Sequence, residues 1–115
     1  MSVSIFTTND IGFKKESQTF SPSGLRNGGL ITEVTINDSS WTALPAVALS
    51  GRNAISIQNR SGFEVKLNYT SSAGYVGMVV PDQYERHYDI TDAISIYARA
   101  ISGAGSVVVI IEEIS

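Results

Sequence analysis

The stretch that decides the fold is Phe63-Glu64-Val65-Lys66-Leu67-Asn68-Tyr69-Thr70, in which apolar and polar side chains alternate without a break. Successive side chains of a β-strand point to opposite faces. The alternation therefore predicts a strand with one face toward a core and the other toward water. Turn-forming residues flank it, at 59–62 and at 71–74. Glycine and asparagine there tolerate the positive φ of tight turns, so the chain is expected to reverse at both ends.

Other segments extend this pattern over most of the chain. Strands are predicted at 30–36, 54–58, 76–80, 94–101 and 107–111, and segments 3–6, 43–49 and 84–90 are candidates for more. Short strands at intervals of about 10–12 residues predict a β-sandwich or a barrel. Pro45 interrupts one apolar run, and 82–93 has no stripe of period 3.6. Little or no helix is therefore expected.

Two segments depart from the alternation. The run Val107-Val108-Val109-Ile110-Ile111 is apolar at every position, which predicts a strand covered on both faces. In residues 7–29, eight of 23 residues are Gly, Ser or Pro. A structureless stretch of that length is unusual within a compact domain. It can be a long surface loop, a disordered segment, or an extended arm whose apolar residues dock on a neighbouring subunit.

The arm hypothesis divides the chain into an N-terminal strand and arm, residues 1–29, and a β-sandwich domain, residues 30–115. Its expected anchors are Phe13, Phe20 and Leu25, which are spaced along the segment.

Composition excludes several classes of function. The chain has 115 residues and a formal net charge of −3, which argues against a nucleic-acid partner because phosphate binding needs a basic surface. It has no cysteine, which excludes disulfides and thiolate chemistry. No apolar run approaches the roughly 20 residues that span a bilayer, so no membrane partner is expected. The first residues lack the basic and long apolar regions of a secretory signal.

Residues that could carry chemistry are few. His87 is the only histidine, so a Ser-His-Asp triad would have to use it. It lies in the polar run Glu85-Arg86-His87-Tyr88-Asp89, which is typical of a solvated edge strand or loop. Glu112 and Glu113 should point to opposite strand faces and so not chelate a metal together; a calcium loop at Asp89 and Asp92 is a weak alternative. We expect no enzyme activity and no catalytic, metal or cofactor residues, because no nucleophile elbow, P-loop or dinucleotide motif occurs.

Aromatic residues are the more informative set. Five lie in or near turns and polar faces: Trp41, Tyr75, Tyr84, Tyr88 and Tyr97. Exposed tryptophan and tyrosine serve both sugar-binding surfaces and protein interfaces. The alternative is that each covers the edge of the core with its polar group in water. Trp41, Tyr84 and Tyr88 are the predicted surface contacts.

One part of the chain resembles a known group of proteins. It runs from Trp41-Thr42-Ala43-Leu44-Pro45 to Leu49-Ser50-Gly51-Arg52-Asn53-Ala54-Ile55-Ser56-Ile57-Gln58-Asn59. The pattern resembles small virion proteins encoded in the structural modules of tailed bacteriophages. Such proteins continue with a hairpin, a glycine-led strand with a proline, a segment like Ile96-Tyr97-Ala98, and a Gly-rich turn before a Val-rich strand. The matching segments are 63–69, 77–81, 94–100 and 103–111. The resemblance covers about residues 41–112 and does not extend to 1–40.

The resemblance implies a β-sandwich, with a jelly roll as one form of it, that decorates or staples a capsid by bridging major capsid protein subunits. Head decoration (cement) proteins are often short and oligomeric, which implies a homodimer or homotrimer here. The expected location is the outer capsid surface of the virion, after assembly in the host cytoplasm. The alternative functions are a carbohydrate-binding module and a receptor-binding component of a tail or fibre.

Overall fold

The computed structural model describes residues 27–115, and the regular elements in this range are all β-strands. The strands are β3 (Gly29–Asn37), β4 (Thr42–Ala43), β5 (Ala54–Asn59), β6 (Val65–Asn68), β7 (Met78–Val80), β8 (Tyr84–Tyr88), β9 (Tyr97–Ala100) and β10 (Ser106–Ile114). This confirms the all-β prediction for the described range. The same range contains no helix of the length and apolarity that crossing a membrane requires.

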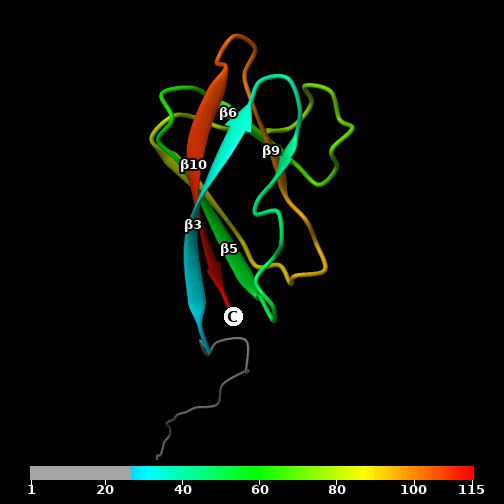
Figure 1. Ribbon diagram of the computed structural model, residues 1–115, viewed down its shortest axis with the longest axis vertical. Helices are drawn as coiled ribbons and strands as arrows, with labels where there is room; N and C mark the ends of the chain where they lie inside the picture. The colour runs from blue at the N-terminus through cyan, green and yellow to red at the C-terminus, as the bar shows by residue number, and fades with distance from the viewer. Residues whose placement is uncertain (1–26) are drawn as a thin grey trace, which may run out of the picture.

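The strands form two antiparallel sheets of four strands each. One sheet has the order β3-β10-β5-β8, and the other has the order β4-β9-β6-β7 (Figure 1). Within the first sheet no two neighbours are consecutive in the chain. In the second sheet, β6 and β7 are the one pair of neighbouring strands that also follow each other in the chain. The chain therefore passes from one sheet to the other at nearly every connection.

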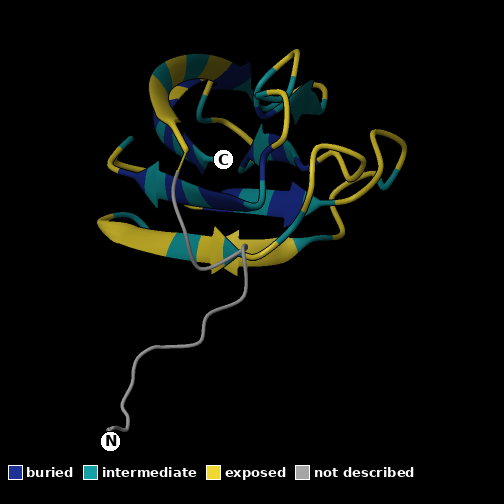
Figure 2. Ribbon diagram, turned by 90° about the horizontal axis from the view of Figure 1, so that it is seen from below, coloured by how far each residue is buried: buried dark blue, intermediate teal, exposed yellow. Residues whose placement is uncertain are grey.

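The core lies between the two sheets, and Figure 2 shows buried residues gathered between the layers of strands. Alternate residues of each central strand supply it. The first sheet contributes Ile36, Ile55, Ile57, Val107, Val109 and Ile111, and the second contributes Val65, Leu67, Val80, Ala98 and Ala100. Burial of these side chains is the main driving force for joining the two layers.

The stretch at 63–70 forms a shorter strand than its alternation predicts. Val65 and Leu67 are buried, as expected, and Lys66 lies half-buried on the opposite face. Phe63 and Tyr69, however, lie outside β6 and are 41% and 60% exposed. The candidate segment 84–90 contains β8. The candidate strand 43–49 is wrong except for Ala43, which ends β4, because residues 44–49 form an irregular connection. The predicted segment 3–6 and the anchors Phe13, Phe20 and Leu25 lie outside the described residues.

The prediction for the last strand is wrong on one face. Val107, Val109 and Ile111 of β10 are buried, but Val108 is 41% exposed and Ile110 is half-buried. Within residues 27–115 no second layer covers this outer face. The β-branched side chains suit a central strand, flanked by β3 and β5, without requiring burial on both sides.

Candidate functional site

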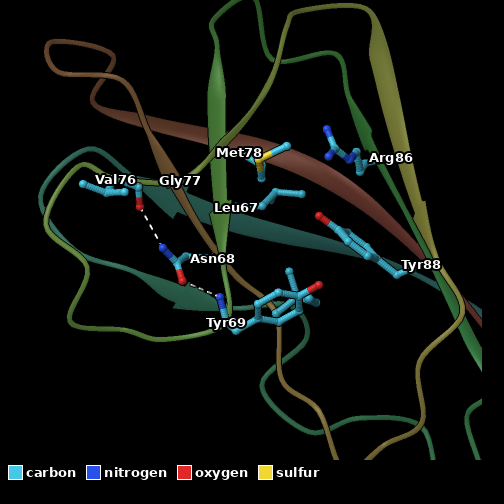
Figure 3. A pocket seen from close by; sticks show the side chains of 9 residues that line it. Leu67, Asn68, Tyr69, Val76, Gly77, Met78, Arg86 and Tyr88 are labelled. Carbon is cyan, nitrogen blue, oxygen red and sulfur yellow. Dashed lines mark hydrogen bonds between the residues drawn. The ribbon is translucent and has the colours of Figure 1, made fainter.

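A pocket of about 470 Å³ opens between β7 and β8, which are edge strands of different sheets. We call it the β7–β8 pocket. It is lined by Leu67, Asn68, Tyr69, Val76, Gly77, Met78, Arg86, Tyr88 and Ile96. Figure 3 shows Leu67 and Met78 on one wall, with Arg86 and Tyr88 facing them and Tyr69 beside Tyr88. Its volume is in the range of small-molecule and side-chain binding sites.

The opening follows from the sheet topology. β7 pairs with β6 and β8 pairs with β5, so the two edges do not hydrogen-bond to each other. The connection between them is short, and its Gln83 N–H donates to the Asn59 carbonyl over 2.7 Å. Exposure rises along β7 away from this connection, from buried Val80 to Met78, which is 56% exposed. The gap between the sheets is thus closed at Val80 and open at Met78.

A glycine shapes one wall of the pocket. A Cβ on Gly77 would lie 2.7 Å from the Leu67 carbonyl oxygen and 3.1 Å from Cη2 of Trp41. Contacts this short with backbone atoms require the strand to move. Gly77 therefore allows the chain entering β7 to lie directly against β6, with the Trp41 ring packed beside it.

Aromatic rings and one cation give the pocket its chemical character. The Tyr69 and Tyr88 rings meet edge to face, with centroids 6.2 Å apart and planes at 68°. The guanidinium carbon of Arg86 is 6.0 Å from the Tyr88 centroid. Burial raises the pKa of the Tyr88 hydroxyl above its ordinary 10.0, although the nearby Arg86 charge opposes the shift. Tyr88 is thus neutral at pH 7, and Arg86 is the one charged residue in the lining.

Arg86 makes no salt bridge to a carboxylate among the described residues, where the ion pairs are Arg52–Glu113 and His87–Asp89. Within the part of the chain that the structure describes, its charge therefore faces the pocket without a counter-ion. Because a cation in such surroundings gains from an outside aromatic or acidic group, the pocket is the strongest candidate binding site.

The predicted surface aromatics are only partly brought together. Tyr88 lines the pocket, whereas Tyr84 is 64% exposed at the other end of β8. Trp41 is half-buried and donates its indole N–H to the Gly74 carbonyl over 2.8 Å. Trp41 and Tyr84 do not line the pocket. Tyr69, which supplies its other aromatic wall, was not among the predicted contacts, although the alternation placed it on the apolar face.

A second cluster of polar residues joins three loops. The Asp38 carboxylate accepts the N–H groups of Gly103 and Gly105 at 3.0 and 2.9 Å. These two hydrogen bonds hold the pKa of the Asp38 carboxyl below its ordinary 3.8, and the bond from Gly105 has the larger effect. Arg99 stacks 3.9 Å over the Tyr75 ring and donates to the Asp38 and Gly74 carbonyls. The side chains of this cluster are thus engaged within the molecule, which indicates a structural role.

A buried ion pair was not predicted. Arg52 donates to a Glu113 carboxylate oxygen over 3.0 Å, and both side chains are almost completely buried. The same oxygen accepts the Leu49 N–H, and Arg52 also donates to the carbonyls of Thr91 and Ile94. The pair therefore fixes two loops onto β10. The alternation of β10 was the available signal, since it places Glu113 on the inward face with Val109 and Ile111.

His87 takes part in a Ser-His-Asp chain of hydrogen bonds on the outer face of the first sheet. Ser56 Oγ lies 2.9 Å from His87 Nδ1, and His87 Nε2 lies 2.9 Å from Asp89 Oδ1. The His87 and Asp89 side chains are 53% and 85% exposed. β5 has a partner strand on each side, so the N–H groups around Ser56 face neighbouring strands. The backbone N–H groups of β5 next to Ser56 are therefore engaged in the sheet and not free to stabilise an oxyanion.

The described residues contain no group of three or more His, Asp or Glu side chains placed to hold a metal ion. Comparison with known proteins adds no assignment: no protein-family model and no curated protein sequence matches the chain.

Proposed function

We propose that this protein is a non-enzymatic structural component of a tailed-phage virion, which decorates or staples the capsid by bridging major capsid protein subunits. In this proposal the fold is a β-sandwich of the jelly-roll type, and the segment before Asn27 forms an extended arm. The predicted boundary after residue 29 moves toward the N-terminus, because Asn27 and Gly28 already bond to Ser115 and Gly29 begins β3. The protein acts as a homo-oligomer on the outer capsid surface.

The strand order supports the fold assignment. Eight strands divided as β3-β10-β5-β8 and β4-β9-β6-β7 have the arrangement of a jelly roll built from two Greek keys. Viral capsid proteins and lectins both use this fold. Because one fold hosts many functions, the function has to be argued from the surface.

The observation that carries the proposal is the exposed apolar surface around the β7–β8 pocket. Tyr69, Val76 and Met78 are 60%, 74% and 56% exposed. Grouped apolar side chains that remain exposed mark contact sites on soluble proteins. The buried arginine and the Asp38 cluster, in contrast, have their partners within the molecule. The open side of the two sheets is therefore the surface best suited to a neighbouring subunit.

Bridging needs no chemistry. A protein that binds the assembled lattice but not its separate subunits stabilises that lattice by mass action. Several weak contacts in one oligomer then add through effective concentration. A net charge of −3 suits an outer surface better than one facing DNA.

The test is binding of the full-length protein to capsid shells of its phage that lack it, measured by co-sedimentation, with unassembled major capsid protein as the comparison. Val76→Asp should abolish shell binding, because it places a charge in the apolar surface. Val47→Asp is the matched control, since Val47 is 84% exposed and does not line the pocket. Absence of binding to shells, or equal loss for both variants, would reject the proposal.

A second candidate function is carbohydrate binding. The Tyr69–Tyr88 pair beside Arg86 offers stacking surfaces and a polar donor in one hollow. Of the aromatic residues predicted as surface contacts, this site includes Tyr88 but neither Tyr84 nor Trp41, whose indole N–H is already bonded. A glycan array gives the test: a hit that Tyr69→Ala removes would favour this function over bridging.

A further inference from the structure

The lining of the β7–β8 pocket is suited to an aromatic ring. The Tyr69 and Tyr88 rings already pack edge to face, and a third ring can add to such a cluster. Arg86 supplies a cation for the face of a ring. Met78 supplies a thioether, which packs favourably against aromatic edges. Within residues 27–115 no phenylalanine or tryptophan lines the pocket.

The N-terminal segment joins the described fold at the same end of the first sheet as the pocket. The Asn27 N–H donates to the Ser115 carbonyl, which places the start of β3 beside the end of β10. Leu30 pairs with Glu113, Glu113 with Ile55, and Ile55 with Tyr88. Leu30 and Tyr88 therefore lie in one row across the sheet, three interstrand spacings or about 14 Å apart.

Phe20 is the aromatic residue nearest to Asn27 on the N-terminal side. Phe20 and Asn27 are seven positions apart in sequence, and an extended chain of seven residue steps spans up to about 24 Å. Phe20 can therefore reach across the row to the pocket. Phe13 lies seven residues further away and would close a longer loop at a greater cost in chain entropy.

We propose that the β7–β8 pocket binds the Phe20 side chain of the N-terminal segment of this chain. In this proposal the Phe20 ring lies beside Arg86 and against the tyrosine pair. This assignment does not depend on the proposed virion function, because it concerns the purified protein without shells. On a shell, Phe20 and a neighbouring subunit would compete for the same pocket.

The absence of cysteine from the chain permits a direct test by disulfide trapping in the full-length protein. Ser21→Cys places a thiol next to Phe20, and Val76→Cys places one at the pocket rim. The control pair combines Ser21→Cys with Val108→Cys, because Val108 is an exposed valine on the outer face of β10. Under mild oxidation, docking should make the Ser21–Val76 pair link about tenfold faster than the control pair, through its higher effective concentration.

Two phenylalanine variants identify the anchor. In the Ser21→Cys/Val76→Cys background, Phe20→Ala should reduce the linking rate to that of the control pair, whereas Phe13→Ala should leave it unchanged. Near-UV circular dichroism verifies that each variant is folded. Mass analysis then shows whether the link lies within one chain, as the assignment requires, or joins two chains, which would overturn it in favour of a second copy as the occupant. Equal rates for the two cysteine pairs, or loss with Phe13→Ala in place of Phe20→Ala, would overturn the assignment.

Discussion

Arg52 and Arg86 are both arginines associated with the space between the sheets, but their surroundings differ. Arg52 is buried, paired with Glu113 and bonded to two carbonyl groups. Arg86 lines an open pocket and has no carboxylate partner among the described residues. Charges inside a fold are costly unless they are paired. The difference indicates that the Arg52 region serves stability, whereas the Arg86 region is built to contact something outside the sheets.

The largest effect is expected at the buried ion pair. Glu113→Gln should lower the free energy of unfolding by about 3–5 kcal/mol, because it leaves the Arg52 charge buried without a counter-ion. Urea denaturation followed by circular dichroism measures the change. Glu112→Gln is the control: Glu112 is half-buried on the opposite strand face and should change stability by less than about 0.5 kcal/mol. If both variants lost the same free energy of unfolding, the Arg52–Glu113 ion pair would not be the source of the stability.

A somewhat smaller effect is expected at the closed end of the pocket. The buried Asn59 side chain donates to the carbonyls of Phe63 and Val80, each over 2.8 Å. Asn59→Ala leaves these groups unpaired and should cost about 2–3 kcal/mol in thermal or urea unfolding. Asn68→Ala removes an exposed bond to the Val76 carbonyl and should cost less than about 1 kcal/mol. The reverse order would mean that the connection between β7 and β8 does not depend on Asn59.

The Asp38 cluster should give a pH-dependent effect. The pKa of Asp38 is lowered in the folded protein, so its stabilising contribution is present above pH 3.8 and is lost as the carboxylate protonates at lower pH. Asp38→Asn should therefore lower the urea midpoint at pH 7, and its difference from the wild type should shrink below pH 3.8. A difference that stays constant between pH 7 and pH 2.5 would contradict the proposed role of the two glycine N–H groups.

The strands could be predicted from the sequence because alternation is local. Val65 and Leu67 face the core, as the pattern at 63–70 indicates. The pairing of strands could not be predicted, since it joins segments distant in the chain, such as Ile36 with Val107. The same limit applies to the ion pair, whose partners are 61 positions apart. The pocket depends on β7 and β8 being edge strands of different sheets, which periodicity does not encode.

The most direct measurement compares Arg52→Met with Arg86→Met, the same substitution in the two regions. Arg52→Met should lower the free energy of unfolding by about 3–5 kcal/mol, because Glu113 is left buried without its partner. Arg86→Met should change this free energy by less than about 0.5 kcal/mol. In the Ser21→Cys/Val76→Cys protein, however, Arg86→Met should slow the disulfide link between positions 21 and 76. An Arg86→Met variant as unstable as Arg52→Met, with an unchanged linking rate, would contradict the distinction between the two regions.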